Sequence, residues 1–450
     1  MSAQFLPCPG CSRHVKRGEP ICPFCGAPAS VEGSATRVLA GHLSRAALFA
    51  AGAVGVGIAT TDCGNTTALA PYGAAPPYGG SPPIEIEEAS AGVGPSAVMA
   101  DAADGLGCHG EACGNPQSCA LGGPGLTNCG DGGSGAESCC ASLEVTGGTY
   151  YRTYDAPPPD DGGAFVDAAD AGDGGPPAGS DPATVSTFRL DKYDVTVGRF
   201  REFVNAWAAG WFPEAGSGKH THLNGGEGLA NAGDDAGSAY EPGWVASDNN
   251  SVSPTNANLA CPLNNGVPTW TALMANNENL PINCVNWYEA YAFCIWDGGF
   301  LPSEAEWQYA AAGGSEQREY PWGSAAPGTA NQYAIYDCDY GSDGGGCPNP
   351  GVGSIANIAP VGTATLGAGL WGQMDLIGDV MVWTLDGWAP YVDPCTDCSN
   401  LGPISVSPGR VFRGAGFDYD AASLSPPEDR RFEDPTFRGY YIGFRCARAP

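Results

Sequence analysis

The pattern of hydrophobic and polar residues predicts two strands and a helix in the middle of the chain. Residues 143–151 are typical of a strand with a bend at its glycine pair, and residues 187–195 alternate apolar and polar side chains, as a half-buried strand does. Apolar side chains then recur at helical spacing, at Val197, Phe200, Val204 and Trp207. We therefore expect two strands followed by a helix between residues 143 and 207.

Two further helices are indicated by their end signals. Asn286 is followed three residues later by Glu289, and Ser303 forms a full capping box with Glu306. A glycine pair ends each of these segments. The remainder is typical of short strands and Gly-rich loops. The predicted fold class is α+β, with little regular secondary structure and with disulfides in its place.

A longer apolar run lies nearer the N-terminus. Residues 46–61 are sixteen uncharged residues, and basic residues between Arg37 and Arg45 precede them. A membrane-spanning helix needs about 20 residues, so the segment 38–63 suits an export signal as well as an anchor, and a buried soluble helix is the alternative. The distribution of basic residues predicts a cytosolic N-terminus and an extracytoplasmic domain downstream. We expect a cell-envelope protein that is anchored in the membrane.

Cys63 directly follows this run and has no partner by cysteine parity. A lipoprotein acceptor cysteine would occupy this place, although Thr60-Thr61-Asp62 is a poor match to the residues expected before one. Cleavage at Cys63 would also remove everything upstream. An uncleaved anchor is therefore preferred over a cleaved lipoprotein.

Composition divides the rest of the chain. Residues 64–107 are rich in Pro, Gly and Ala and predict a disordered linker, and the stretch 155–183 predicts a disordered insertion in the next domain. Residues 108–137 form a Cys-rich segment, whose pairing the sequence does not decide. A domain at 138–450 follows.

The cysteine content indicates the cellular compartment of the protein, and the net charge excludes one class of partner. Nineteen cysteines are usual for an exported protein and unusual for a cytosolic one. The net charge of −30 disfavours nucleic acid, because phosphate binding needs clustered Lys and Arg.

The first 30 residues carry two CxxC pairs, which predict a zinc-ribbon-like knuckle. Each pair places two thiolates in a tight turn, and four thiolates complete a tetrahedral zinc site that would supply the folding energy of so short a segment. The predicted zinc ligands are Cys8, Cys11, Cys22 and Cys25. Two local disulfides are the alternative.

An ordered set of motifs resembles one protein family. It comprises residues 280–294, 299–311 and 320–323, the segment 369–380 with Trp383-Thr384, and finally 410–416 and 443–446. Together they resemble formylglycine-generating enzymes and their sulfatase-modifying-factor relatives. The resemblance implies a variant of the C-type-lectin-like fold.

The resemblance also implies one disulfide, between Cys294 and Cys446. The other pairs are expected from proximity in the sequence alone. They are Cys395 with Cys398, Cys338 with Cys347, and Cys261 with Cys284.

The catalytic positions of the family are altered. Formylglycine-generating enzymes bind copper(I) through two cysteines. Copper(I) is a soft ion, and thiolates are its natural ligands. By resemblance those positions fall on Tyr419 and Leu424, and no cysteine lies between Cys398 and Cys446. Copper is therefore not expected, and no catalytic residue is assigned. Sulfoxide-synthase relatives hold iron with a His-x3-His-x-Glu motif, whereas His220-Thr-His222 has the wrong spacing and no carboxylate nearby in the sequence, so we expect a polar loop there.

The family's calcium-binding positions are only partly kept in this sequence. The resemblance places ligands at Asp375, Gly378 and Val380 for one site and at Asn331 for another, but Val382 replaces the carboxylate that the family has. Losing one carboxylate weakens or abolishes a calcium site.

These features favour an extracytoplasmic domain that binds a ligand without catalysis. The ligand would be a peptide, a glycan or an envelope protein, held in a groove lined by Tyr419 and Trp383. The alternative is an oxidoreductase that uses the family scaffold with different chemistry, and a third interpretation is a structural spacer.

Overall fold

The computed structural model divides the chain into two units, residues 1–98 and residues 99–450. In the first unit it describes only an antiparallel strand pair, β1 (Phe5–Pro7) with β2 (His14–Lys16). In the second it describes residues 116–154, 180–233, 239–261, 266–341, 347, 353–402, 408–421, 424 and 430–450. The zinc ligands, Cys63 and the segment 38–63 lie outside the described residues.

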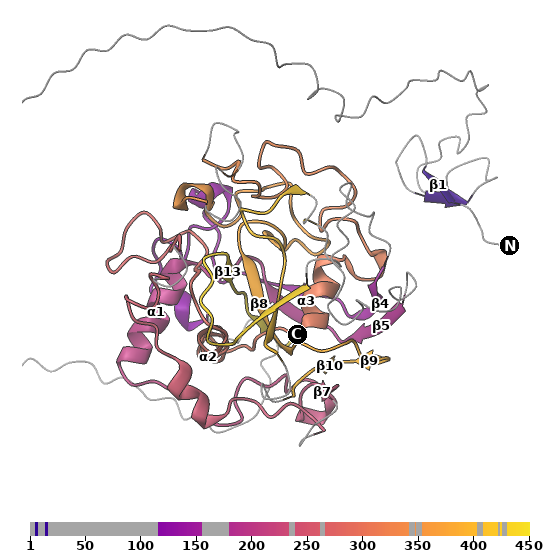
Figure 1. Cartoon of the computed structure of the whole chain (residues 1–450), viewed down its shortest axis with the longest axis horizontal. Helices are drawn as coiled ribbons and strands as arrows, with labels where there is room; N and C mark the ends of the chain where they lie inside the picture. The colour runs from indigo at the N-terminus through magenta and orange to yellow at the C-terminus, as the bar shows by residue number, and fades with distance from the viewer. Residues whose placement is uncertain are drawn as a thin grey trace, which may run out of the picture. The chain divides into compact units, whose positions relative to one another are not determined.

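The described residues of the second unit form three α-helices, each short, with long loops between them (Figure 1). They are α1 (Val197–Ala208), α2 (Trp287–Trp296) and α3 (Glu304–Ala311). Asn286 and Ser303 cap α2 and α3 with complete capping boxes, as their sequences predict. None of the helices in the described part of the chain is long and apolar enough to cross a membrane.

The strands form small sheets. The largest has the order β12-β11-β8-β13, and β8 contacts both α2 and α3 (Figure 1). Two three-stranded sheets have the orders β14-β6-β3 and β4-β5-β9, and β10 pairs with β7. The strands of the second unit are β3 (Ser142–Val145), β4 (Gly148–Thr153), β5 (Ser180–Val185), β6 (Phe188–Asp191), β7 (Ala230–Asn231), β8 (Met381–Gly387), β9 (Cys395–Thr396), β10 (Cys398–Ser399), β11 (Arg410–Arg413), β12 (Arg430–Glu433), β13 (Ile442–Gly443) and β14 (Ala447–Arg448).

The expected α+β fold with little regular structure and several disulfides is confirmed, and one boundary needs correction. The insertion expected to extend to residue 183 ends earlier, because β5 already begins at Ser180. β5 pairs with β4 from Gly148↔Val185 to Thr153↔Ser180, so residues 180–183 are part of a ladder. Residues 155–179 lie outside the described residues.

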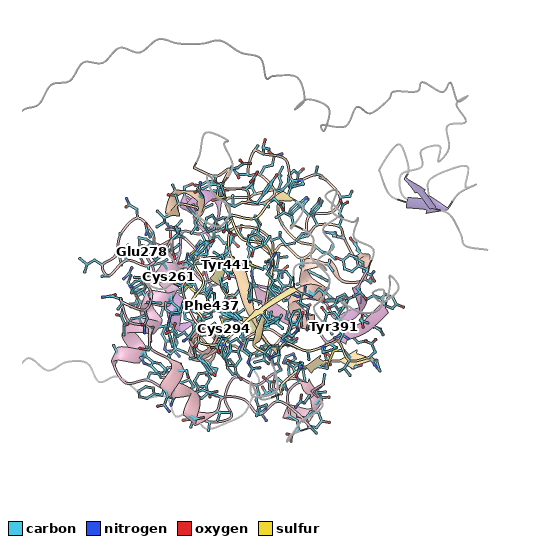
Figure 2. All side chains as sticks on the ribbon, in the orientation of Figure 1. Cys261, Glu278, Cys294, Tyr391, Phe437 and Tyr441 are labelled. Carbon is cyan, nitrogen blue, oxygen red and sulfur yellow. A yellow bond between two sulfur atoms is a disulfide. The ribbon has the colours of Figure 1, made fainter. Side chains whose placement is uncertain are left out.

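An aromatic core surrounds α2. The rings of Phe200 and Phe293 lie 5.9 Å apart, and those of Phe293 and Phe444 lie 5.2 Å apart. The disulfide between Cys294 and Cys446 closes a separation of 152 residues beside this core (Figure 2). It ties α2 to the C-terminal segment of the unit.

The twelve cysteines of the described second unit form six disulfides. Four of them are predicted pairs: Cys261–Cys284, Cys294–Cys446, Cys338–Cys347 and Cys395–Cys398. The other two, Cys119–Cys140 and Cys129–Cys139, lie in the Cys-rich segment and decide part of the pairing that the sequence leaves open.

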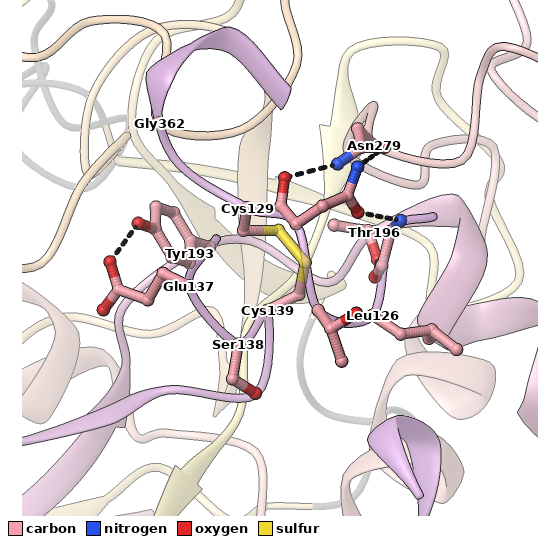
Figure 3. Close-up of a disulfide and its surroundings, with 12 residues drawn as sticks. Leu126, Cys129, Glu137, Ser138, Cys139, Tyr193, Thr196, Asn279 and Gly362 are labelled. Carbon is pink, nitrogen blue, oxygen red and sulfur yellow. Dashed lines mark hydrogen bonds between the residues drawn. A yellow bond between two sulfur atoms is a disulfide. The ribbon is translucent and has the colours of Figure 1, made fainter. Parts of the chain in front are cut away.

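The described end of the Cys-rich segment packs onto the domain (Figure 3). Beside Cys129–Cys139, the Asn128 side chain donates to Asn279 Oδ1 at 3.1 Å, and the Asn279 amide donates back to the Asn128 carbonyl oxygen at 3.1 Å. Tyr193 Oη donates to Glu137 Oε2 at 2.8 Å. The division expected at residue 138 is therefore not a division between units, since residues 116–137 and the domain lie in the same one.

Candidate functional site

The segment that follows β11 holds the two positions where the family's catalytic cysteines would fall. Its backbone is pinned by hydrogen bonds to two neighbouring loops. Phe417 N–H donates to the Asp379 carbonyl oxygen at 2.8 Å, and Asp337 N–H donates to the Tyr419 carbonyl oxygen at 2.7 Å. Gly416 allows a close approach between this segment and Tyr441, because a Cβ there would lie 3.1 Å from Asp418 Oδ1 and 3.4 Å from both Tyr419 Cδ2 and Tyr441 Cβ.

Tyr419 is half-buried and its ring is covered by a cation. The Arg431 guanidinium lies 4.6 Å from the ring centroid, within the range of a cation–π contact. Tyr441 packs beside it and contacts Phe437, whose ring is 6.4 Å away (Figure 2). We call Tyr419, Arg431, Phe437 and Tyr441 the Tyr419 surface. All four side chains are partly buried, so each also presents some area to solvent.

Carboxylates border the Tyr419 surface. Tyr440 Oη donates to Asp418 Oδ2 at 2.8 Å, and burial raises the pKa of Asp418. Burial also raises the pKa of Asp337, and the nearby charges of Asp339 and Asp420 raise it further. Burial, with a contribution from Glu433, raises the pKa of Tyr441 to about 12. The phenol therefore stays protonated at neutral pH and offers a hydrogen-bond donor instead of a base.

The two predicted groove residues have different surroundings. Trp383 is completely buried, and its Nε1–H donates to the Val285 carbonyl oxygen at 3.1 Å. It therefore has no surface for a ligand to contact, and the prediction that it lines a groove is corrected: Trp383 is a core residue. Leu424 is also completely buried, so Tyr419 is the one of the two altered catalytic positions that reaches solvent.

The calcium prediction stays a prediction. The Asp375 carboxylate oxygen Oδ2 accepts from Gly362 N–H at 2.6 Å, and the Asp375 carbonyl oxygen accepts from Arg445 Nη2 at 2.8 Å, so these two oxygens already have partners. Burial raises the pKa of Asp375 to about 6. Gly378 donates its N–H to the Ala415 carbonyl oxygen, and Val380 is buried beside it. Asn331 Oδ1 is buried without a hydrogen-bond partner. Across the described ranges, no group of three or more His, Cys, Asp or Glu side chains could hold a metal ion.

His220 has partners that its sequence neighbourhood does not reveal. Its Nδ1 lies 2.9 Å from Glu241 Oε2, and its Nε2 lies 3.0 Å from Glu306 Oε2. Burial alone would lower the pKa of His220, but the two carboxylates raise it to about 10, so the ring is an imidazolium at neutral pH. His220 lies in a loop, as expected, but it is buried and its carboxylate partners Glu241 and Glu306 come from distant segments of the sequence.

His222, two residues on, contrasts with His220. Its two ring nitrogens are buried without a hydrogen-bond partner, and its ring stacks on Phe300 with centroids 5.6 Å apart. Burial lowers the pKa of His222. The pair therefore combines a charged histidine with a neutral one. Both rings contact buried protein groups, so we interpret the pair as part of the core.

A second buried network lies at the start of α3. Glu304 accepts from Arg430 Nε at 2.6 Å and forms an ion pair with Arg413 Nε at 3.0 Å. Burial would raise the pKa of Glu304, but the two arginines lower it to about 2. Tyr391, which reaches Glu304 with its hydroxyl at 3.3 Å, lies at the edge of this network (Figure 2). This network is not evident from the sequence, because the spacing of its residues carries no local signal.

Comparison with known proteins decides the family. A family model described as "Sulfatase-modifying factor enzyme 1-like domain" matches residues 134–450. The chain belongs to this family. The predicted sulfatase-modifying-factor fold, of the C-type-lectin-like kind, is thereby confirmed.

Individual relatives show how far the likeness extends. The formylglycine-generating enzyme of Thermomonospora curvata is 28% identical over 309 residues, which is 64% of this chain and 92% of that protein. The formylglycine-generating enzyme of Mus musculus is 29% identical over 181 residues, 38% of this chain and 45% of the mouse protein, so this chain spans less than half of the mouse protein's length. A mouse protein named "Inactive C-alpha-formylglycine-generating enzyme 2" is 30% identical over 175 residues, 37% of this chain and 49% of that protein.

Proposed function

We propose that the 138–450 domain binds an extracytoplasmic ligand and does not oxidise cysteine. One observation carries this proposal: every cysteine of the described second unit is held in a disulfide, and the aligned thiolate positions are Tyr419 and Leu424. Copper(I) needs thiolates, and a disulfide sulfur is a poor substitute for one. Family membership alone does not decide the matter, since relatives named as enzymes and a relative named as inactive both match.

The Tyr419 surface supports binding of a ligand. It combines aromatic rings with the Arg431 guanidinium, and aromatic and Arg side chains are enriched at recognition sites because they offer large contact area and specific hydrogen bonds. The Tyr441 phenol is protonated at neutral pH and can donate a hydrogen bond to a ligand. The ligand would be a peptide, a glycan or an envelope protein. It would contact Tyr419 and would not contact Trp383, which is buried.

We further propose that the domain is exported and tethered through residues 38–63, with zinc held by Cys8, Cys11, Cys22 and Cys25 on the cytosolic side. Six disulfides in the second unit support an oxidising compartment, because the cytosol keeps thiols reduced. Thiol labelling in intact cells tests the topology. We expect Cys294 and Cys446 to be oxidised and the four knuckle cysteines to be protected from an impermeant reagent. Reduced Cys294 and Cys446 would contradict export.

The alternative is an oxidoreductase with altered chemistry, and metal content separates it from a binding domain. Copper and iron are measured in the full chain with its four knuckle cysteines replaced by serine, because those thiols would themselves bind copper(I). We expect neither metal in stoichiometric amount. Stoichiometric copper or iron in this variant would favour the oxidoreductase.

A photo-crosslinking residue at position 419 tests binding directly. The matched control carries the same residue at Leu366, which is 53% exposed and lies outside the Tyr419 surface. We expect a defined adduct in the cell envelope from position 419 and none from position 366. Adducts from neither position would favour the structural-spacer interpretation.

A further inference from the structure

The three most exposed large apolar side chains of the described residues lie in two loops. Leu273 is 81% exposed, and Met274 beside it is 63% exposed. Leu121, in the other loop, is 79% exposed. A single exposed leucine needs no explanation, but two adjacent apolar side chains at the surface of one loop do. We call Leu121, Leu273 and Met274 the apolar tips.

Both loops are fixed to the beginning of α1. A Cβ at Gly198 would lie 2.6 Å from the Pro124 carbonyl oxygen, so the segment that follows Leu121 packs directly on the first turn of this helix. Arg201 Nη1 donates to the Thr271 carbonyl oxygen at 3.0 Å, which fixes the second loop. Gly198 and Arg201 are three residues apart and therefore lie on one face of α1. The apolar tips thus rise from neighbouring points on the surface of the domain.

The loop that carries Leu273 has backbone groups that side chains of the protein already bind. Thr271 Oγ1 donates to the Leu273 carbonyl oxygen at 2.8 Å, and Ala275 N–H donates to Glu278 Oε1 at 3.1 Å. Glu278, which is labelled in Figure 2, is buried and accepts from Arg201 Nη2 at 2.7 Å. A backbone group that leaves water without a partner is costly, so these bonds reduce the cost of moving the loop out of water.

Both loops also lie in stretches of sequence without charge. No Asp, Glu, Lys or Arg occurs between Glu111 and Asp131, or between Asp248 and Glu278, although the chain as a whole has a net charge of −30. Charged side chains resist entry into hydrocarbon. Their absence from both stretches therefore favours an apolar environment for the loops over a charged partner.

The kind of side chain distinguishes a lipid surface from a protein partner. Trp, Tyr and Arg dominate the binding energy of protein interfaces, where Leu is under-represented. The apolar tips are instead aliphatic and thioether side chains that project from the surface, and such side chains enter hydrocarbon without a shaped counterpart. The negative net charge favours a zwitterionic lipid over an anionic one.

The position of the apolar tips also fits a membrane. The described part of the second unit begins at residue 116, five residues before Leu121. The chain that leads from the proposed tether at residues 38–63 therefore enters the domain beside the apolar tips. A domain that is held to a membrane at this point of entry has these loops nearest to the lipid.

We propose that Leu121, Leu273 and Met274 insert into a zwitterionic lipid surface and dock the domain on the membrane. The inference rests on the proposed tether, because three apolar side chains bind weakly by themselves and the tether keeps them at a high local concentration. Docking fixes the orientation of the domain relative to the membrane. It does not require a ligand at the Tyr419 surface, so the two can fail separately.

Fluorescence of the full chain in phosphatidylcholine vesicles tests the docking. An environment-sensitive fluorescent amino acid takes the place of Met274, and the matched control carries it in place of Leu366, which is 53% exposed and lies outside the two loops. Bromine on the lipid acyl chains quenches only a fluorophore that it contacts. We expect brominated vesicles to reduce the emission from position 274 and to leave the emission from position 366 unchanged. With the fluorophore at position 274, the substitutions Leu121→Asn and Leu273→Asn should weaken the quenching, and they should leave the fold intact because both side chains are exposed.

Flotation of the same vesicles separates this inference from the tether. A chain that floats with the vesicles without quenching at position 274 overturns the docking and leaves the tether standing. A chain that does not float overturns the tether and the docking with it. Equal quenching at positions 274 and 366 overturns the docking, since contact with lipid is then not specific to the apolar tips. A blue shift at position 274 without quenching by bromine also overturns it, because a second copy of the chain then covers the loop.

Discussion

The surroundings of α2 and the segment after β11 use the same family scaffold in opposite ways. Around α2, Cys294 is locked to Cys446 and the neighbouring aromatic rings are buried against one another. After β11, Tyr419 is only half-buried, and the Arg431 guanidinium lies over its ring. Cysteine thus stabilises the fold beside α2, whereas the segment after β11 has no cysteine at the positions where the family's catalytic pair would fall. The comparison teaches that the scaffold cysteines and the family's catalytic positions are separate residues, so the first are kept here while the second are altered.

The largest expected effect is loss of the Cys294–Cys446 disulfide. Replacing both cysteines by alanine should lower the free energy of unfolding by about 5 kcal/mol on the chain-entropy model, because the bridge closes a separation of 152 residues. Chemical denaturation measures the change. The matched control replaces Cys395 and Cys398, which are only three residues apart, and should cost about 2 kcal/mol. Equal losses in the two variants would show that loop length does not set the contribution of these bridges.

The next largest effect is expected at His220. The variant His220→Gln leaves the carboxylates of Glu241 and Glu306 buried without a cation, which should cost about 3–5 kcal/mol of unfolding free energy. The control His222→Gln should cost far less, because the His222 ring nitrogens have no hydrogen-bond partner to lose. A larger loss from His222→Gln than from His220→Gln would contradict the roles assigned to the pair.

The pH dependence of stability should carry the signature of His220. Its pKa is about 10 in the folded chain and near 6.5 when unfolded, so the folded state binds the extra proton between these values. The stabilisation is fully present below pH 6.5 and is lost as the pH rises through 10. The free energy of unfolding, followed by denaturation at a series of pH values, should fall across this window. The fall should be weaker in His220→Gln, and an unchanged slope would mean that another group is responsible.

The smallest effect on stability is expected at Tyr419. Tyr419→Ala removes one partly exposed ring and its cation–π contact with Arg431, which should cost about 1 kcal/mol or less. Ligand capture in the cell envelope should nevertheless be lost. Tyr419→Phe keeps the ring under the guanidinium and should retain both stability and most of the capture. A loss of several kcal/mol in Tyr419→Ala would place this residue in the scaffold instead.

The three helices, and the caps of α2 and α3, were predictable from the sequence because their signals are local. The capping boxes of Asn286 with Glu289 and of Ser303 with Glu306 each fall within four residues. The start of β5 was not predictable, because its acidic, Pro-containing sequence resembles the insertion before it and only the ladder with β4 reveals the strand.

The site was predictable only in part. Tyr419 could be named because the family motif fixes its position, but the complete burial of Trp383 depends on packing that no motif records. The partners of His220 are 21 and 86 residues away.

Oxygen consumption tests the central claim most directly. The full chain, with its four knuckle cysteines replaced by serine as in the metal analysis, is supplied with copper(I), oxygen and a cysteine-containing peptide. The formylglycine-generating enzyme of Thermomonospora curvata serves as the positive control. The account predicts no oxygen uptake above the background of free copper and no aldehyde in the peptide. Uptake coupled to conversion of the peptide cysteine would contradict the claim that this domain has kept the scaffold without the chemistry.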